Sequence, residues 1–182
     1  MTALGVAIEE WQGFYAAVAG VGATLVGLVY VGTSIHLGRH PLDDRARLLA
    51  TMAGVNLLYP VLTSLVLLMP VQPSIVGGAL LLIAAFAVGA SLSITRAEAR
   101  HPGDWTRQLF VYRYLVPLAT SMVLATGAVG LLLGYRWSLA APPVFVLVMF
   151  VVGADNAWDL LLGRYLKRSF VDVGTRLPHQ GQ

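Results

Sequence analysis

Five long apolar stretches, separated by short polar or proline-rich connections, dominate the pattern of hydrophobic and polar positions along the chain. Each approaches the 20 or so residues that a helix needs to cross the hydrocarbon core of a bilayer. They cover residues 14–37, 48–69, 74–95, 109–134 and 139–162. The pattern therefore predicts an all-α, polytopic helical membrane bundle with five transmembrane helices, forming a single transmembrane domain over residues 1–182. The alternative is four spans, with one apolar segment merely buried.

The basic residues lie almost entirely on one side of this predicted bundle. All but one of the 12 Lys and Arg residues lie in the two longer loops, just past the second of them (Arg113), or in the C-terminal segment, and the exception is Arg136 in the short fourth connection. Because Lys and Arg are enriched in cytoplasmic loops, the chain is expected to run N-out and C-in. Residues 163–182 then form a basic cytoplasmic tail. Anionic lipid headgroups are the expected partners of the basic loops and tail.

The composition supports a membrane protein. Hydrophobic residues make up 57% of the chain and charged residues only 12%, whereas soluble domains average about 25% charged residues. The basic balance is explained by cytoplasmic loops, so nucleic acid is not an expected partner. The absence of cysteine excludes disulfides, thiolate nucleophiles and zinc–sulfur sites.

A short motif recurs in the second and fourth spans. Both contain Pro-x-x-Thr-Ser, which matches Pro60, Thr63 and Ser64 with Pro117, Thr120 and Ser121. A second similarity, between Phe86–Ser91 and Phe150–Asp155, follows in the same order. The pattern predicts one lone span followed by two parallel, repeated hairpins, which is a known membrane architecture. Chance similarity between segments rich in Val, Gly and Ala is the alternative.

The two shared prolines are expected to kink their helices. A proline inside a helix leaves the carbonyl four residues earlier without its N–H partner. The carbonyls released by Pro60 and Pro117 belong to Asn56 and Arg113, two polar residues at matching places in the proposed repeat.

These polar residues belong to a larger set expected at one level of the inner leaflet. The set comprises Ser34, His36, Asn56, Ser91, Arg113, Asp155, Asn156 and Asp159. One interpretation is a buried clasp, in which Arg113 pairs with Asp155 or Asp159 and joins the two hairpins. The other is a proton or ion path, since ionisable residues inside the membrane commonly mark such paths.

Small residues recur at helical spacing on two of the spans. Ala19, Ala23 and Gly27 form one such face, and Thr126, Gly130 and Gly134 form another. Faces of this kind let transmembrane helices approach closely. Either face could bind a second copy of the chain, and packing within one copy is the slightly favoured expectation for the first span.

Sequence motifs for catalysis or cofactor binding are not found. The chain has no Walker loop, HExxH or Gly-x-Ser-x-Gly, and its four His residues lack metal-ligand spacing. We therefore expect no enzyme activity, no cofactor and no metal site.

Two segments resemble a group of small, uncharacterised, multi-pass bacterial membrane proteins of the actinobacterial type. They are WQGFYAAVAGVGATLVGLVYVGTSIHL (Trp11–Leu37) and DNAWDLLLG (Asp155–Gly163). Some members of that group are labelled as modulators of a membrane-anchored AAA protease. The resemblance implies a multi-pass protein of the bacterial cytoplasmic (inner) membrane. The expected function is a non-enzymatic interaction or accessory module, forming a homo-oligomer or binding another membrane protein. A small oligomeric channel or transporter that conducts through the polar cluster is the alternative.

Overall fold

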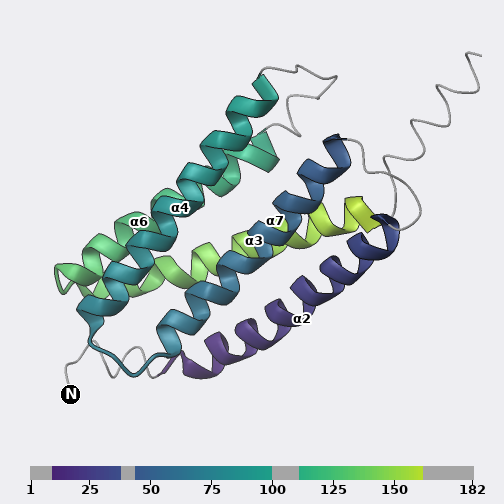
Figure 1. Cartoon of the computed structure of the whole chain (residues 1–182). Coiled ribbons are helices and arrows are strands. Elements are labelled where there is room, and N and C mark those ends of the chain that lie inside the picture. The colour runs from purple at the N-terminus through teal and green to yellow at the C-terminus, as the bar shows by residue number, and fades with distance from the viewer. Residues whose placement is uncertain (1–9, 38–43, 100–110, 162–182) are drawn as a thin grey trace, which may run out of the picture.

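The computed structural model of the chain describes residues 10–37, 44–99 and 111–161, and within these ranges every regular element is helical (Figure 1). A π-helical turn, η1, leads directly into α6, and a 3-10 turn, η2, leads directly into α7. The elements are α2 (Gln12–Leu37), α3 (Asp44–Leu68), α4 (Pro73–Ala99), η1 (Val111–Leu115), α6 (Val116–Leu132), η2 (Arg136–Ala140) and α7 (Ala141–Leu161). The predicted all-α class is confirmed for this part of the chain.

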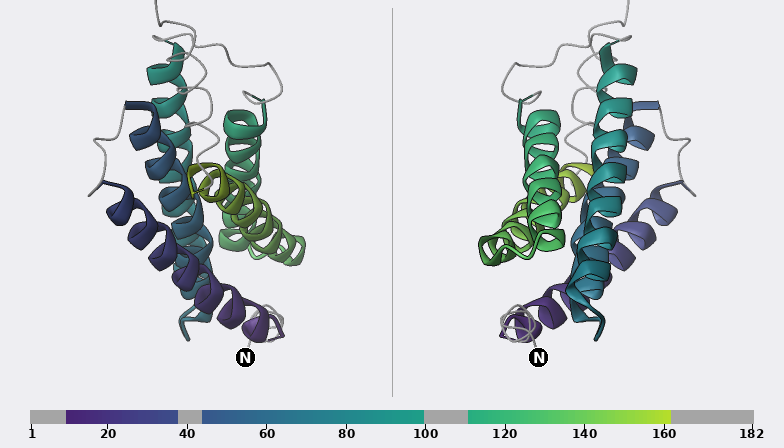
Figure 2. Two further views of the ribbon diagram at one scale, coloured as in Figure 1. Left: turned by 90° about the vertical axis from the view of Figure 1, so that its right-hand side faces the viewer. Right: turned by 90° about the vertical axis from the view of Figure 1, so that its left-hand side faces the viewer.

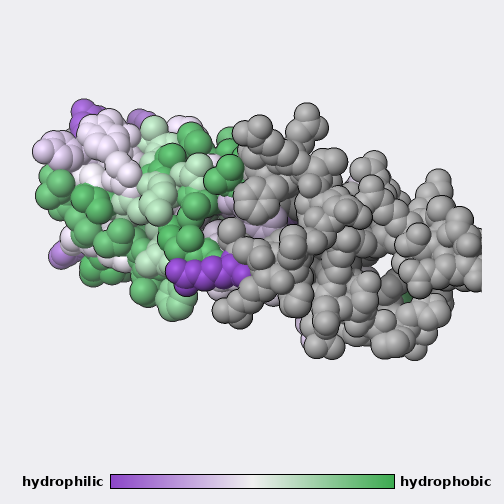
Figure 3. Space-filling model, turned by 90° about the horizontal axis from the view of Figure 1, so that it is seen from above, coloured by the Kyte–Doolittle hydropathy of each residue, from purple (hydrophilic) through white to green (hydrophobic). Residues whose placement is uncertain are grey.

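Four of the helical segments are long and apolar enough to cross a membrane. They are Gln12–Ile35, Ala50–Leu68, Pro73–Ser93 and Arg136–Trp158, whereas the apolar helix at Val116–Leu132 is shorter. It is shorter because the five residues before it form the π turn rather than α-helix. Large apolar side chains lie exposed on these helices, among them Leu28, Leu82 and Leu147. Figure 3 shows such side chains over much of the described surface on the side in view.

The first hairpin consists of α3 and α4, and the second consists of α6 and α7. Each of these helices packs mainly on a helix of the other hairpin. α3 packs most extensively on α7, and α4 packs most extensively on α6, whereas α3 and α4 have far less contact with each other. α2 lies against α3, on the side of the bundle away from α6 (Figure 2). Exchanging the two hairpins would turn the α3–α7 contact into the α6–α4 contact. This arrangement is what a repeat of two parallel hairpins requires.

The burial pattern of α3 agrees with the proposed repeat. Five matching positions are buried both in α3 and in the η1–α6 segment: Leu57 with Tyr114, Pro60 with Pro117, Thr63 with Thr120, Ser64 with Ser121 and Leu67 with Leu124. The shared Pro-x-x-Thr-Ser motif therefore occupies equivalent positions in the packing.

The second half of the sequence alignment is out of register by one residue. It pairs Gly89 with Gly153, but Gly89 is exposed and Gly153 is buried. Moving the alignment by one position pairs buried residues with buried residues: Val76 with Ala141, Leu80 with Phe145, Ala84 with Met149 and Ala87 with Val152. Small residues are common in both helices, so a Val-Gly-Ala match carried no information about which positions face the core.

The prolines are accommodated in two different ways. α3 continues as α-helix on both sides of Pro60, whereas Pro117 is the second residue of α6, which begins directly after the π turn ends. In a π turn each carbonyl accepts from the N–H five residues on, and such turns commonly mark an irregular point in a helix. The hydrogen-bond register thus changes where Pro117 has no N–H to donate.

Two close helix approaches on α3 occur at glycines that the sequence pattern did not single out. A Cβ atom on Gly22 would lie 2.6 Å from Cγ2 of Val61, and one on Gly153 would lie 2.8 Å from Cγ of Leu57. These two glycines let α3 pack closely against α2 on one side and against α7 on the other. In contrast, a Cβ atom on Gly27, in the face predicted to pack, would have nothing within 4 Å.

We expect Gly153→Ala to destabilise the protein in detergent by about 1–3 kcal/mol, the usual cost of overpacking a core. Gly89→Ala is the matched control, because a Cβ there would meet nothing within 4 Å, and its higher helix propensity is worth up to about 1 kcal/mol. Thermal unfolding of the two variants in the same detergent gives the comparison. Equal effects of the two substitutions would contradict the close α3–α7 contact.

Candidate functional site

The predicted polar cluster is only partly assembled. Asn56 and Asn156 are buried, with 8% and 0% of their surface exposed. Each directly precedes a member of the small apolar cluster in which Leu57 and Ala157 pack together. The two amides therefore belong to the same segment of the α3–α7 contact. Ser91, on α4, is half-buried.

Two members of the predicted cluster lie at the surface instead. Asp155 is exposed, because neighbouring positions on a helix point about 100° apart and Asn156 takes the inward direction. Ser34 is exposed on α2, and its hydroxyl donates a 2.8 Å hydrogen bond to the carbonyl of Tyr30. The side chains of His36, Arg113 and Asp159 lie outside the described residues, so the Arg113–aspartate clasp stays a prediction.

Asp155 has a polar neighbour on a different element. Tyr112, in the π turn, is close enough to feel the charge of the Asp155 carboxylate. Both residues belong to the second hairpin, where the end of α7 lies near the π turn that leads into α6. A single exposed carboxylate beside a phenol can exchange a proton or attract a cation, but it does not by itself define a catalytic pair.

Asn156 is the most unusual polar side chain in the described part of the chain. Its amide nitrogen and oxygen are both buried, and neither has a hydrogen-bond partner among the described residues. Leaving such a group unpaired costs about 1–3 kcal/mol. Asn156 therefore lowers the stability of the α3–α7 contact. A residue with this cost is expected to serve a function other than stability.

The hydroxyls of the repeated motif are bonded differently in its two copies. Thr120 donates to the carbonyls of Val116 and Pro117, and Ser121 donates to Pro117 at 2.7 Å. Thr63 and Ser64 occupy the equivalent buried positions on α3 but have no hydrogen-bond partner within the described ranges. The second copy thus satisfies its hydroxyls on its own helix beside the π turn.

α2 has two opposite faces of different character. Tyr15, Gly22 and Val29 are buried on one face, and small residues lie exposed on the other: Ala16, Gly20, Ala23, Thr24 and Gly27. Of the four long apolar segments, α2 has the smallest buried share. The favoured expectation that Ala19, Ala23 and Gly27 pack within one copy is therefore wrong for Ala23 and Gly27, and Ala19 is only half-buried. Gly22 supplies that packing instead.

The second predicted small-residue face is divided among different roles. Thr126 is exposed and Gly130 is buried beneath the turn that follows α6. Gly134 is not part of the helix; its φ of 80° places it in the left-handed conformation that ends helices. A glycine just past an apolar helix is the signal that could have identified this helix end from the sequence.

Within residues 10–37, 44–99 and 111–161, no three His, Cys, Asp or Glu side chains are grouped so as to hold a metal ion. The fold and the site together define an all-helical bundle with four helices long and apolar enough to cross a membrane and an internal polar segment between α3 and α7.

No protein-family model matches the chain, and no curated protein or solved structure shows significant similarity to it.

Replacing Asn156 by Leu is expected to raise the stability of the protein in detergent by about 1–3 kcal/mol. The substitution replaces a buried amide that has no partner among the described residues with an apolar side chain of similar size. Asn156→Asp is the contrasting variant, and its buried charge should lower the melting temperature. Thermal unfolding measures both effects. A large loss of stability in the Leu variant would show that the amide makes a hydrogen bond essential to the fold.

Proposed function

We propose that the protein is a non-enzymatic interaction module of the bacterial cytoplasmic membrane that associates with another membrane helix through the exposed face of α2. The observation that carries this proposal is the two-sided character of α2, whose small residues face away from its own bundle. In the proposed topology the chain has five spans and runs N-out and C-in, with the segment from Val111 to Leu132 as the fourth span. The resemblance of two segments to small bacterial membrane proteins supports the proposed location.

The physical argument rests on how helices associate in lipid. Lipid tails are as apolar as the helix surface, so the hydrophobic effect does not drive helices together in a bilayer. Association depends instead on close packing, which small residues allow. Nothing lies within 4 Å of a Cβ placed on Gly20 or Gly27, and Thr24 already bonds the carbonyl of Gly20 at 2.9 Å. A partner helix could therefore approach this face closely without leaving a polar group unpaired. The partner is either a second copy of the chain or another membrane protein.

Cysteine cross-linking tests this proposal directly, because the natural chain contains no cysteine. Gly27→Cys lies on the small-residue face, and Leu28→Cys is a control at the same depth that is also exposed but points about 100° away. We expect oxidation in native membranes to cross-link the Gly27 variant several-fold more than the Leu28 variant.

The partner is identified by the size of the cross-linked product. A band at twice the monomer mass indicates a second copy, and any other discrete band indicates a different membrane protein. Equal yields at the two positions, or no product at either, would contradict association through this face.

A small proton or ion conduit is the second candidate function, and the buried amide of Asn156 favours it. Transport paths commonly contain polar groups that would be costly in a purely structural core. Asn156 has no partner among the described residues and is adjacent to the exposed Asp155. In this alternative, Asp155 attracts the cation or proton and Asn156 forms part of the path between α3 and α7.

Flux measurements in liposomes distinguish the conduit from the interaction module. Asp155→Asn should preserve the fold and abolish proton or cation flux, since the amide keeps the shape of the carboxylate but loses its charge. Glu10→Gln is the control, because Glu10 is exposed and lies before the first residue of α2. A conduit is rejected if the unmodified protein shows no flux, or if Asp155→Asn conducts as well as the control.

A further inference from the structure

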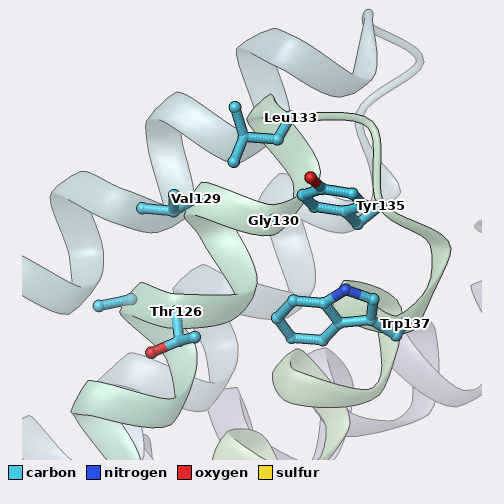
Figure 4. Close-up of a pocket in the computed structure, with 7 residues that line it drawn as sticks. Thr126, Val129, Gly130, Leu133, Tyr135 and Trp137 are labelled. Atoms are coloured by element: carbon cyan, nitrogen blue, oxygen red, sulfur yellow. The ribbon is translucent and has the colours of Figure 1, made fainter.

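Two adjoining hollows lie on the surface of α6 near the turn to α7. One has a volume of about 360 Å³, and its lining includes Ala125, Thr126, Val129, Leu133, Tyr135 and Trp137. The other has a volume of about 430 Å³, and its lining includes Met122, Val123, Thr126, Trp137, Ala140 and Val144. They share Thr126 and Trp137, so together they form one shallow apolar groove along α6. Figure 4 shows the first hollow with Trp137 facing the side of α6 that carries Gly130 and Thr126.

The aromatic end of this groove is held in place by the turn that follows α6. The N–H of Tyr135 donates to the carbonyl of Gly130 at 2.9 Å, and the N–H of Gly134 donates to Leu131 at 3.1 Å, which is a Schellman-type helix end. The hydroxyl of Ser138 donates to the carbonyl of Tyr135. The groove is therefore formed before anything binds in it.

Trp137 packs above a position where no side chain fits. A Cβ atom on Gly130 would lie 2.7 Å from Cβ of Ser138 and 3.5 Å from Cη2 and Cζ2 of the Trp137 ring. The ring of Tyr135 stacks against Trp137, with centroids 6.2 Å apart and planes inclined by 24°. Paired Tyr and Trp rings of this kind concentrate where hydrocarbon meets the headgroup layer.

The charge at this end of the bundle complements an anionic headgroup. Arg136 lies between the two aromatic residues and is exposed. The turn between α3 and α4 lies at the same end of the bundle (Figure 1). In the predicted topology, Arg136 is the one basic residue on this side of the membrane. Its guanidinium is suited to hold a phosphate group beside the aromatic pair.

The length of the groove matches one lipid chain. From Met122 to Leu133, α6 rises about 17 Å at 1.5 Å per residue. Half of a typical hydrocarbon core measures about 15 Å. The groove thus runs from the aromatic pair to near the middle of the bilayer, which is the depth that one acyl chain reaches from its headgroup.

A lipid fits this groove better than a helix does. The ring of Trp137 borders both hollows, and a rigid helix about 10 Å across is a poor match for a groove that passes such a ring. A flexible acyl chain can follow the groove past the ring. The combination of an exposed cation, an interfacial aromatic pair and an apolar groove of one-chain length matches the parts of a phospholipid in order.

We propose that this groove, from Met122 to Trp137, binds one anionic phospholipid, with its phosphate on Arg136 and one acyl chain along α6. In the proposed topology the site lies in the outer leaflet, opposite the basic loops and tail. The inference needs the chain to lie in a bilayer, but it is independent of the association proposed for α2.

Native mass spectrometry of the full-length protein released from mixed nanodiscs tests the site. The nanodiscs contain equal amounts of phosphatidylglycerol and phosphatidylcholine with identical acyl chains. We expect one tightly retained lipid, with phosphatidylglycerol favoured several-fold. Arg136→Gln should remove that preference, and Arg96→Gln should keep it, because Arg96 is exposed near the opposite end of α4.

A second pair of variants tests the groove itself. Thr126→Phe should fill the junction between the hollows and reduce retention of both lipids several-fold, while Leu82→Phe on the exposed surface of α4 should not. Thr126 is exposed, so its variant is expected to melt at an unchanged temperature. An unaltered lipid preference in Arg136→Gln, or unaltered retention in Thr126→Phe, would overturn the proposal. So would dimers of the unmodified protein that Thr126→Phe dissociates, because a helix would then occupy the groove.

Discussion

Close contact between α3 and α7 is the interaction on which the rest of the bundle depends. Gly153 brings α7 against Leu57, and Gly22 brings α2 against Val61 on the neighbouring turn of α3. α3 is thereby fixed on two sides, and α2 is attached to the bundle chiefly through it. The same contact contains the buried Asn56 and Asn156. A polar segment at this place is tolerable only because dispersion contacts on either side hold the two helices together.

Much of the fold follows from the sequence because apolar length is a direct physical signal. The stretches around α2, α3, α4 and α7 are long and uniform, so their helical character was predictable without any knowledge of packing. The Pro-x-x-Thr-Ser motif was also informative, since its residues occupy equivalent buried positions in α3 and α6. The Val-Gly-Ala similarity was not informative, because residue type alone does not indicate which face of a helix is buried.

The candidate site was harder to predict for the same reason. Asp155 and Asn156 are adjacent in the sequence and equally polar, yet one is exposed and the other completely buried. That difference depends on the rotation of α7 about its axis, which Gly153 fixes through its contact with Leu57. The groove on α6 depends on the turn at Tyr135 and Trp137, and aromatic residues in a turn do not by themselves indicate a hollow. Its hollow shape comes from Gly130 and from the way the chain reverses at Gly134.

The crosswise pairing of the hairpins has a consequence for biosynthesis. The main packing partners of α3 and α4 are α7 and α6, which lie later in the chain. The first hairpin is therefore synthesised before either of its helices has its main partner. Until then the side of α3 at which Leu57 receives Gly153 has no protein partner, whereas the side that packs on α2 already has one. The two hairpins can therefore complete each other's packing only after α7, the last described helix, has been synthesised.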